Sequence, residues 1–334
     1  MQNMQIEKQN LLKLISKFKG KNILIVGDVM LDKFIAGGVS RISPEAPVQV
    51  VSVNRESYVP GGAGNVASNI AALGGNGKLV GIVGTDHAGE IIKSELRQRK
   101  IEPLLVETKS RPTTQKIRVL AQNQQLLRID YEEEEKIDHE LENHITETIT
   151  KHLDKTDIIV VSDYAKGVIT KKIMALIISS AKKKKIPVLI DPKPKNKEFY
   201  KGATLITPNH KEANQMCSLP DNRNDESLIN VGTRLAKELK TNVLITRGEK
   251  GMSLFEIEKQ KITQTHIPTK AKEVYDVTGA GDTVIGTLAV ALAAGATLKE
   301  AMTLANHAAG IVVGKVGTAT CSVEELNKAV SDNE

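Results

Sequence analysis

Short runs of β-branched and aliphatic residues recur along this 334-residue chain, and a stretch with helical periodicity follows each of them. These runs lie at 23–26, 79–83, 158–161, 188–190, 205–206 and 243–245. Apolar strands that alternate with helices are typical of a parallel sheet with helices on both faces. The pattern therefore predicts an α/β fold, which we expect to form a single domain over residues 1–334.

Two segments break this alternation. Residues 34–59 and 112–131 alternate apolar and polar positions without an intervening helix. A period of two residues predicts antiparallel strands and a hairpin. We expect the two segments to form a small antiparallel β appendage that covers one edge of the main sheet.

Composition and charge exclude several classes of protein. The 46 Lys+Arg and 40 Asp+Glu residues give a net charge of +6, but only 5 Tyr, 4 Phe and no Trp are available to stack on bases. The densest basic run, 182–185, ends a helical stretch, where cations complement the helix dipole. We therefore expect no nucleic-acid partner.

No apolar run approaches the roughly 18 residues that a membrane span needs, and the first residues lack the pattern of a secretory signal. We expect a cytoplasmic protein with no membrane partner. Cys217 and Cys321 lie far apart in the sequence, and the histidines show no metal-ligand spacing. The sequence therefore favours neither a zinc site nor a disulfide framework.

The strongest chemical signal is the sequence DVTGAGD at 276–282, which precedes a small, apolar, helix-compatible run. Gly279, Ala280 and Gly281 would bring backbone N–H groups to the start of a helix, where they could bind an anion. Asp282 could take a proton from a nucleophilic hydroxyl during phosphoryl transfer. A glycine turn with Asp282 as a helix cap explains these residues equally well.

A second polar cluster follows the run at 205–206. Asn209 and Glu212 lie three residues apart at an expected helix start, so their side chains share a face. Such side chains could hold water around Mg²⁺, although a helix cap is the simpler interpretation. The sequence TRG at 246–248 follows another strand and could lie against a nucleotide phosphate, or form a turn.

Near the N-terminus, Asp28 and Asp32 follow the first strand, at the sheet edge where open α/β sheets bind ligands. Their carboxylates suit sugar hydroxyls. The sequence PGGAGNVASN at 60–69 opens a helix and contains the spacing G-x-G-x-x-A of dinucleotide-binding loops. It follows a polar segment rather than a buried strand, so a nicotinamide-dependent oxidoreductase is only a remote alternative.

Further polar residues could complete a site at the same edge. Asp163 and Lys193 follow predicted strands, and Lys193 could meet a phosphate. Lys116 and Arg118 alternate along one face of the second appendage segment, where they could clamp a substrate phosphate. A solvated strand face is an equally good explanation for this pair.

The sequences GD at 27–28, PGGAGNVA at 60–67, NHKE at 209–212 and DVTGAGD at 276–282 occur in one characteristic order. With them the chain resembles the PfkB or ribokinase-like carbohydrate kinases over about residues 20–325. The resemblance implies a ribokinase-like fold: a mostly parallel sheet with helices on both faces and a small antiparallel β lid from about 34–59 and 112–131.

GDVMLD at 27–32, SDYAKG at 162–167 and VGKVGTAT at 313–320 narrow the resemblance to kinases of D-glycero-β-D-manno-heptose 7-phosphate. It implies ATP-dependent phosphorylation of the anomeric O1 to heptose 1,7-bisphosphate, for ADP-heptose and the lipopolysaccharide core. The chain looks like the stand-alone kinase, without the adenylyltransferase domain of bifunctional relatives. A PfkB-type kinase for another sugar or sugar phosphate is the alternative.

The resemblance also implies a role for each site residue. Asp282 is the base, and the amides of Gly279, Ala280 and Gly281 form an anion hole. The ATP and Mg²⁺ contacts are Asn209, His210, Lys211, Glu212, Thr246, Arg247, Gly248 and Asn306, with Glu212 reaching Mg²⁺ through water. The sugar-phosphate contacts are Asp28, Asp32, Gly62, Asn65, Lys116, Arg118, Asp163 and Lys193. Asp276 and Thr278 border a monovalent-cation site that could take K⁺, and the β lid forms the interface of a homodimer.

Overall fold

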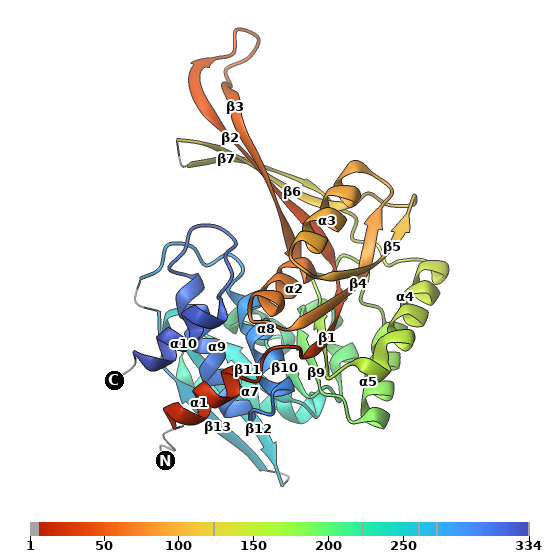
Figure 1. The fold of residues 1–334 in the computed structure, drawn as a ribbon, viewed down its shortest axis with the longest axis vertical. Coiled ribbons are helices and arrows are strands. Elements are labelled where there is room, and N and C mark those ends of the chain that lie inside the picture. Colours follow the sequence, from red (N-terminus) through yellow and green to blue (C-terminus); the bar gives the residue numbers. More distant parts are fainter. Residues whose placement is uncertain (1–6, 123, 222–223, 260, 272, 333–334) are drawn as a thin grey trace.

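The main sheet has nine strands in the order β13-β12-β11-β10-β9-β8-β1-β4-β5. It belongs to a computed structural model that describes residues 7–332 except 123, 222–223, 260 and 272 (Figure 1). The strands are β1 (Asn22–Gly27), β4 (Asn76–Gly84), β5 (Glu102–Thr108), β8 (Ile158–Ser162), β9 (Val188–Asp191), β10 (Leu205–Ile206), β11 (Asn242–Thr246), β12 (Met252–Glu258) and β13 (Lys261–Ile267). Neighbouring strands from β5 to β11 are parallel, while β12 and β13 add an antiparallel edge. All the apolar runs that the sequence predicts as strands lie in this sheet.

Helices cover both faces of the main sheet, because successive residues of its inner strands face opposite sides. Ile23 and Ile25 of β1 belong to one apolar core, and Leu24 and Val26 belong to the other. The first core is closed by α1 (Lys8–Ile15), α2 (Ala63–Ala72), α3 (His87–Gln98), α8 (Ala280–Ala293), α9 (Leu298–Val312) and α10 (Val323–Ser331). The second is closed by α4 (His139–His152), α5 (Lys171–Lys184), α6 (His210–Met216) and α7 (Asp225–Leu239).

Three short 3-10 helices complete the described elements: η1 (Leu153–Lys155), η2 (Pro194–Tyr200) and η3 (Gly248–Lys250). Cys217 and Cys321 are buried and free. Within the described ranges, no helix combines the length and the apolar character that crossing a membrane would take.

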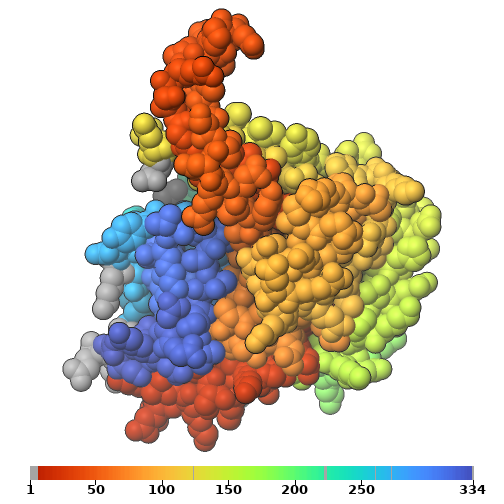
Figure 2. All heavy atoms as spheres, turned by 45° about the horizontal axis from the view of Figure 1, so that its top comes forward, coloured from red at the N-terminus to blue at the C-terminus, as the bar shows by residue number. Residues whose placement is uncertain are grey.

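A separate four-stranded sheet, in the order β3-β2-β6-β7, contains most of the two segments that break the α/β alternation. It consists of β2 (Val29–Ile42), β3 (Gln49–Gly62), β6 (Thr114–Ala121) and β7 (Gln124–Tyr131). The hairpins β2–β3 and β6–β7 are antiparallel, and they join through a parallel pairing of β2 with β6. This small sheet continues from the carboxyl end of β1, and its β2–β3 hairpin projects from the body of the molecule (Figures 1 and 2).

Candidate active site

Asp282 lies in the first turn of α8, where that helix meets α2. The N-cap residue Gly279 has a left-handed φ of 80°, and a Cβ there would lie 2.7 Å from Nδ2 of Asn65. Only glycine therefore lets α8 begin so close to α2. Asn65 donates a hydrogen bond of 2.6 Å to Oδ2 of Asp282, and the Tyr164 hydroxyl donates one of 2.9 Å to Oδ1.

This environment gives Asp282 the properties of a general base. Burial, and to a smaller extent the charge of Asp32, raise the pKa of Asp282, while the hydrogen bonds from Asn65 and Tyr164 and the charge of Lys193 lower it; the net result is a pKa of about 6. The carboxylate is thus ionised at neutral pH but binds a proton much more readily than an exposed aspartate. Groups with a pKa near the working pH are the most effective proton acceptors.

The start of α8 also offers backbone N–H groups. In the described part of the chain, the amides of Gly281 and Asp282 donate to no backbone acceptor, and a Cβ at Gly281 would meet only open space. The amide of Ala280 instead donates to the carbonyl of Val277 at 3.2 Å. The predicted anion hole therefore needs correction, because the Ala280 amide is already engaged in the turn that precedes the helix.

Asp28 holds a loop rather than facing a ligand. Its side chain is 2% exposed, and its carboxylate accepts hydrogen bonds from the amides of Tyr164, Lys166 and Val168 at 2.8, 3.2 and 3.2 Å. Burial and the neighbouring charge of Asp163 raise the pKa of Asp28 to about 6. The predicted contact of Asp28 with a sugar hydroxyl is replaced by a structural role.

Asp163, like Asp28, is buried and bound by protein groups. Its side chain is fully buried, and Oδ2 accepts hydrogen bonds of 2.7 Å from Asn196 and from the Tyr200 hydroxyl. Oδ1 accepts a third from the Ala165 amide, again at 2.7 Å. Protein donors thus surround the carboxylate of Asp163, which indicates a structural role for this residue; its contact with substrate stays a prediction.

Asp32 and Arg118 form an ion pair on the side of the site that faces the small sheet. Nη1 of Arg118 lies 2.6 Å from Oδ1 of Asp32, and the guanidinium stands 5.2 Å from the centre of the Phe34 ring. Lys116 lies two residues earlier on β6, and its Nζ is 3.6 Å from Oδ2 of Asp130 and 3.7 Å from Oε2 of Glu132. The alternation that placed both cations on one strand face is thus present, but each cation has an acidic partner.

Gly62 and Asn65 connect the small sheet to α2. Gly62 has a φ of 56°, and a Cβ there would lie 2.5 Å from the carbonyl oxygen of Asp28. The glycine-rich segment therefore enters α2 from β3 of the small sheet, not from a strand of the main sheet. A dinucleotide loop requires a central parallel strand at this place, so the oxidoreductase alternative loses its structural basis.

Lys193, Glu212 and Asn209 form a chain of contacts beside Tyr164. Nζ of Lys193 lies 2.5 Å from Oε1 of Glu212 and 5.2 Å from the centre of the Tyr164 ring. Asn209 caps α6 through its Oδ1, which accepts from the Glu212 amide at 2.9 Å, while Oε2 of Glu212 accepts from the Asn209 amide at 3.0 Å. The helix-cap interpretation is therefore correct. In addition, the ion pair with Lys193 connects Glu212 to the residues around Tyr164.

Asp191, at the end of β9, is a site residue that the sequence analysis did not select. Burial raises the pKa of Asp191 well above its usual range, and the charges of Asp282 and Glu212 raise it further. The sequence DPK at 191–193, which directed attention to Lys193, also contained this residue.

Two adjoining cavities lie beside the start of α8. The first has a volume of about 510 Å³ and is largely apolar; its lining includes Thr246, Gly248, Val277, Gly281 and Asn306. The second, of about 410 Å³, is lined by Asn209, His210, Lys211, Thr246, Arg247, Gly248, Glu249, Lys250 and Val277. The predicted nucleotide residues other than Glu212 thus line one connected region.

Several of these side chains already have protein partners. Asn306 donates to the carbonyl of Pro268 at 2.7 Å, and Nδ1 of His210 lies 3.0 Å from Asp221. Arg247 pairs with Asp225 of α7, which a sequence pattern around 246–248 could not reveal.

Asp276 joins two loops at the mouth of the first cavity. Its Oδ1 accepts from the Thr278 amide at 2.8 Å, and its Oδ2 accepts from the Gly317 amide at 3.2 Å. Burial alone would raise the pKa of Asp276, but these hydrogen bonds outweigh it and hold the pKa below its usual value. The carboxylate is therefore ionised at neutral pH, as a cation ligand must be.

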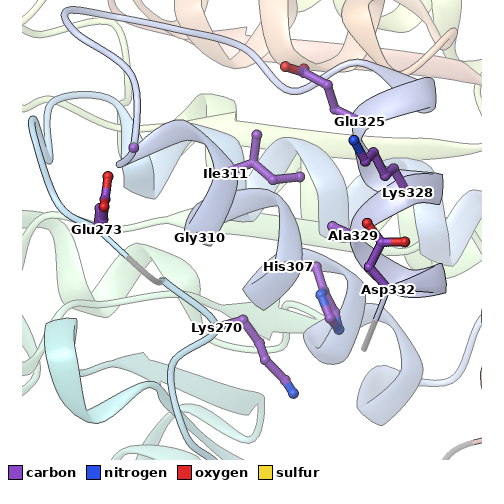
Figure 3. A pocket seen from close by; sticks show the side chains of 10 residues that line it. Lys270, Glu273, His307, Gly310, Ile311, Glu325, Lys328, Ala329 and Asp332 are labelled. Carbon is purple, nitrogen blue, oxygen red and sulfur yellow. The ribbon is translucent and has the colours of Figure 1, made fainter. Parts of the chain in front are cut away.

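A further cavity, of about 500 Å³, lies between α9, α10 and the segment before α8 (Figure 3). Lys270 and Lys328 line it together with acidic side chains, and His307 projects from α9. It contains none of the predicted site residues, so the candidate site is the region around Asp282.

Comparisons with known proteins show which proteins this chain resembles. The Bifunctional protein HldE of Proteus mirabilis is 48% identical over 314 residues, which cover 94% of this chain and 64% of that protein. The protein of the same name from Geobacter sulfurreducens is 46% identical over 323 residues, covering 96% of this chain and 65% of that protein. The chain thus spans somewhat less than two thirds of the length of these relatives.

Solved structures share the fold. A ribokinase of Arabidopsis thaliana, complexed with ribose and ATP, aligns with a TM-score of 0.72 at 20% identity and covers 94% of this chain and 100% of its own. Phosphofructokinase-2 of Escherichia coli, in complex with potassium, aligns with a TM-score of 0.76 at 20% identity, covering 93% and 98%. The model of the pfkB family carbohydrate kinases matches residues 21–326. The chain therefore belongs to the pfkB family of carbohydrate kinases.

Proposed function

We propose that the protein is an ATP-dependent kinase that phosphorylates the anomeric O1 of D-glycero-β-D-manno-heptose 7-phosphate. The observation that carries this proposal is the buried Asp282, which lies at a helix start with available amides between an apolar cavity and the Asp32–Arg118 pair. The choice of sugar rests on the sequences GDVMLD and SDYAKG, which resemble heptose 7-phosphate kinases. The product, heptose 1,7-bisphosphate, would serve ADP-heptose and lipopolysaccharide core synthesis in the cytoplasm, where ATP is available.

The proposed reaction gives each of these groups a role. Asp282 accepts the proton of the anomeric hydroxyl as that oxygen bonds to the γ-phosphorus of ATP, and the bond from this phosphorus to the β,γ-bridging oxygen breaks to release ADP. The amides of Gly281 and Asp282 stabilise the charge that develops on the transferring group. Arg118 and Lys116 bind the phosphate of the sugar by exchanging their acidic partners for it.

ATP and Mg²⁺ are the proposed cofactors. The apolar cavity of about 510 Å³ suits the adenine and ribose. Glu212 and Asp191 offer carboxylate oxygens, the ligands that Mg²⁺ prefers, and this ion needs few protein ligands because it keeps several waters. Bound Mg²⁺ would neutralise charge on the phosphates. Asp276 and Thr278 offer oxygen atoms for a monovalent cation such as K⁺.

We also propose that the small sheet closes over the sugar and forms the interface of a homodimer. Closure excludes water, which would otherwise compete with the sugar hydroxyl for the γ-phosphate. Large apolar side chains are exposed on this sheet and in the turn of its β2–β3 hairpin: Ile42, Val48, Val53, Leu126, Leu127 and Ile129. An exposed cluster of this kind is typical of an interaction surface.

The proposal is tested by measuring ADP release with ATP and Mg²⁺ across a panel of acceptors. The panel contains D-glycero-D-manno-heptose 7-phosphate, fructose 6-phosphate, ribose and adenosine, and phosphorus NMR identifies the product. We expect selective turnover of the heptose and a new anomeric phosphate. Selective turnover of another acceptor would overturn the assigned substrate, and saturable NADH binding without kinase activity would overturn the reaction class.

A further inference from the structure

The loop that follows β8, residues 163–168, has an unusual backbone. Ala165 has a φ of 57° and Gly167 a φ of 95°. A left-handed conformation is uncommon for a residue with a side chain and persists only where surrounding contacts enforce it. Contacts with the surrounding structure must therefore fix the conformation of this loop.

The enforcing contacts come from both sides. Asp28, which directly follows β1, accepts a hydrogen bond from the amide of Tyr164 at 2.8 Å, and within the loop Asp163 accepts one from the amide of Ala165 at 2.7 Å. Arg111 donates to the carbonyl of Lys166 at 3.0 Å. These contacts involve buried or half-buried groups, so they fix the backbone on either side of Tyr164.

The Tyr164 side chain is the part of this loop that reaches the reacting centre. Its hydroxyl donates to Oδ1 of Asp282 at 2.9 Å, while Asn65 donates to Oδ2 at 2.6 Å. Each oxygen of the base thus has a donor, and the two donors come from separate elements. The centre of the tyrosine ring lies 5.2 Å from Nζ of Lys193, which pairs with Glu212.

We propose that Tyr164 is a positioning residue: its hydroxyl fixes the orientation of the Asp282 carboxylate and keeps that carboxylate ionised in a buried, acidic environment. The inference rests on the proposed function, in which Asp282 takes the proton of the sugar hydroxyl. Asp28 and Asp163 act one step further out, because they set the backbone that carries Tyr164.

The charges around Asp282 explain why such a donor is needed. Asp32 faces Asp282 from β2, Asp191 from the end of β9, and Lys193 from the segment after β9. Burial and the charge of Asp32 favour the protonated carboxyl, whereas the hydrogen bonds from Asn65 and Tyr164 and the charge of Lys193 favour the carboxylate. Removing the tyrosine hydroxyl takes away one of the groups that favour the carboxylate, so we expect the pKa of Asp282 to rise above its value of about 6.

The test is the pH dependence of kcat in Tyr164→Phe, which keeps the ring beneath Lys193 and removes only the hydroxyl. We expect the acid limb of the profile to move upward by about one pH unit, since hydrogen bonds to charged groups have that magnitude. The KM for ATP should stay within about twofold, because the hydroxyl does not contact the nucleotide cavity. An acid limb that stays in place would overturn the inference.

A matched control is Tyr58→Phe on β3, which removes a tyrosine hydroxyl that donates to Glu56 at the same distance of 2.9 Å. Its acid limb should coincide with that of the wild type. A shift equal to that of Tyr164→Phe would contradict a local effect on Asp282.

A second substitution covers the case in which Tyr164→Phe does not fold. 3-Fluorotyrosine at position 164 is nearly isosteric and its phenol is the stronger donor, so the acid limb should move downward. An upward shift or no shift would overturn the inference. An inactive wild type would contradict the proposed function instead, and the profiles can be recorded with whichever sugar phosphate the wild type accepts.

Discussion

At the scale of single residues, the site depends on a buried carboxylate that has no cation at hydrogen-bond distance among the residues the structure describes. Asp282 accepts hydrogen bonds from two neutral donors, Asn65 and Tyr164, and burial raises its pKa to about 6. The raised pKa makes Asp282 a better base, but it also means that ionising the group costs stability.

This cost predicts that Asp282→Asn stabilises the protein at alkaline pH. Because the folded-state pKa is raised from 3.8 to about 6, the wild type is most stable below pH 4 with respect to this group and loses that contribution as pH rises through 6. The asparagine removes this loss, so urea unfolding at pH 8 should show a gain of about 2–3 kcal/mol. Near pH 4 the gain should vanish, and a gain of equal size at both values would contradict this account.

The sequence predicted the residues of this site better than their roles. Asp282, Asn65 and Asp32 lie close together: Asp282 and Asn65 are in the first turns of α8 and α2, and Asp32 is on β2. Asp28 and Asp163 were expected to bind substrate, but a local pattern cannot show which distant groups donate to them. Amides of the loop at 164–168 donate to Asp28, and the side chains of Asn196 and Tyr200 donate to Asp163. The Tyr164 hydroxyl was missed because its partner lies 118 positions further along the chain.

At the scale of elements, the loop at 163–168 should be the most sensitive connection near the site. A Cβ at Gly167 would lie 2.0 Å from the carbonyl oxygen of Glu135, whereas one at Gly202 would meet only a methyl group of Ile178 at 3.6 Å. Both glycines have similar φ values of 95° and 87°. Alanine variants at these two glycines therefore suffer similar backbone strain, but only the variant at 167 also places its Cβ against backbone atoms.

We expect Gly167→Ala to lower the free energy of unfolding by about 2 kcal/mol more than Gly202→Ala, as overpacking against backbone commonly does. It should also reduce kcat, because Tyr164 is carried by the same loop. Chemical denaturation and steady-state kinetics of the two variants check this. Equal stability of the two variants would show that the loop can move freely.

The strand β6 allows a prediction about substrate binding. Arg118→Ala should raise the KM for the sugar phosphate at least about tenfold, which is the size of a lost charge-assisted hydrogen bond, and leave the KM for ATP nearly unchanged. Lys33→Ala is the control, because Lys33 pairs with Glu56 on β3 instead of Asp32. An unchanged KM for the sugar phosphate in Arg118→Ala would exclude Arg118 from the phosphate clamp.

The inner strands of the main sheet were predictable because β1, β8, β9 and β11 are apolar on both faces. The edge strands β5 and β13, and β12 next to β13, were not anticipated, since they are partly exposed and polar residues such as Glu256 and Thr263 weaken their pattern. The small sheet was expected from its alternation, but the parallel pairing of β2 with β6 joins segments that no local pattern connects.

At the scale of the whole molecule, the projecting small sheet leaves apolar side chains in water. Leu127 is 54% exposed and Val53 is 53% exposed, on strands of the same sheet. Leu127→Glu combined with Val53→Glu should shift a dimer toward monomer in light scattering over a concentration series, since burying the new charges is costly. Ile257→Glu on β12, at the other end of the main sheet, should leave the mass unchanged.

The central claim is that Asp282 takes the proton of the sugar hydroxyl, and it is tested most directly by turnover and ATP binding of Asp282→Asn. We predict that turnover falls by about a thousandfold, within the range for loss of a general base, while the Kd for ATP changes little. Asp138→Asn, at the N-cap of α4, serves as the matched exchange outside the site and should leave turnover unchanged. Near-wild-type turnover of Asp282→Asn with ATP still bound would contradict the account.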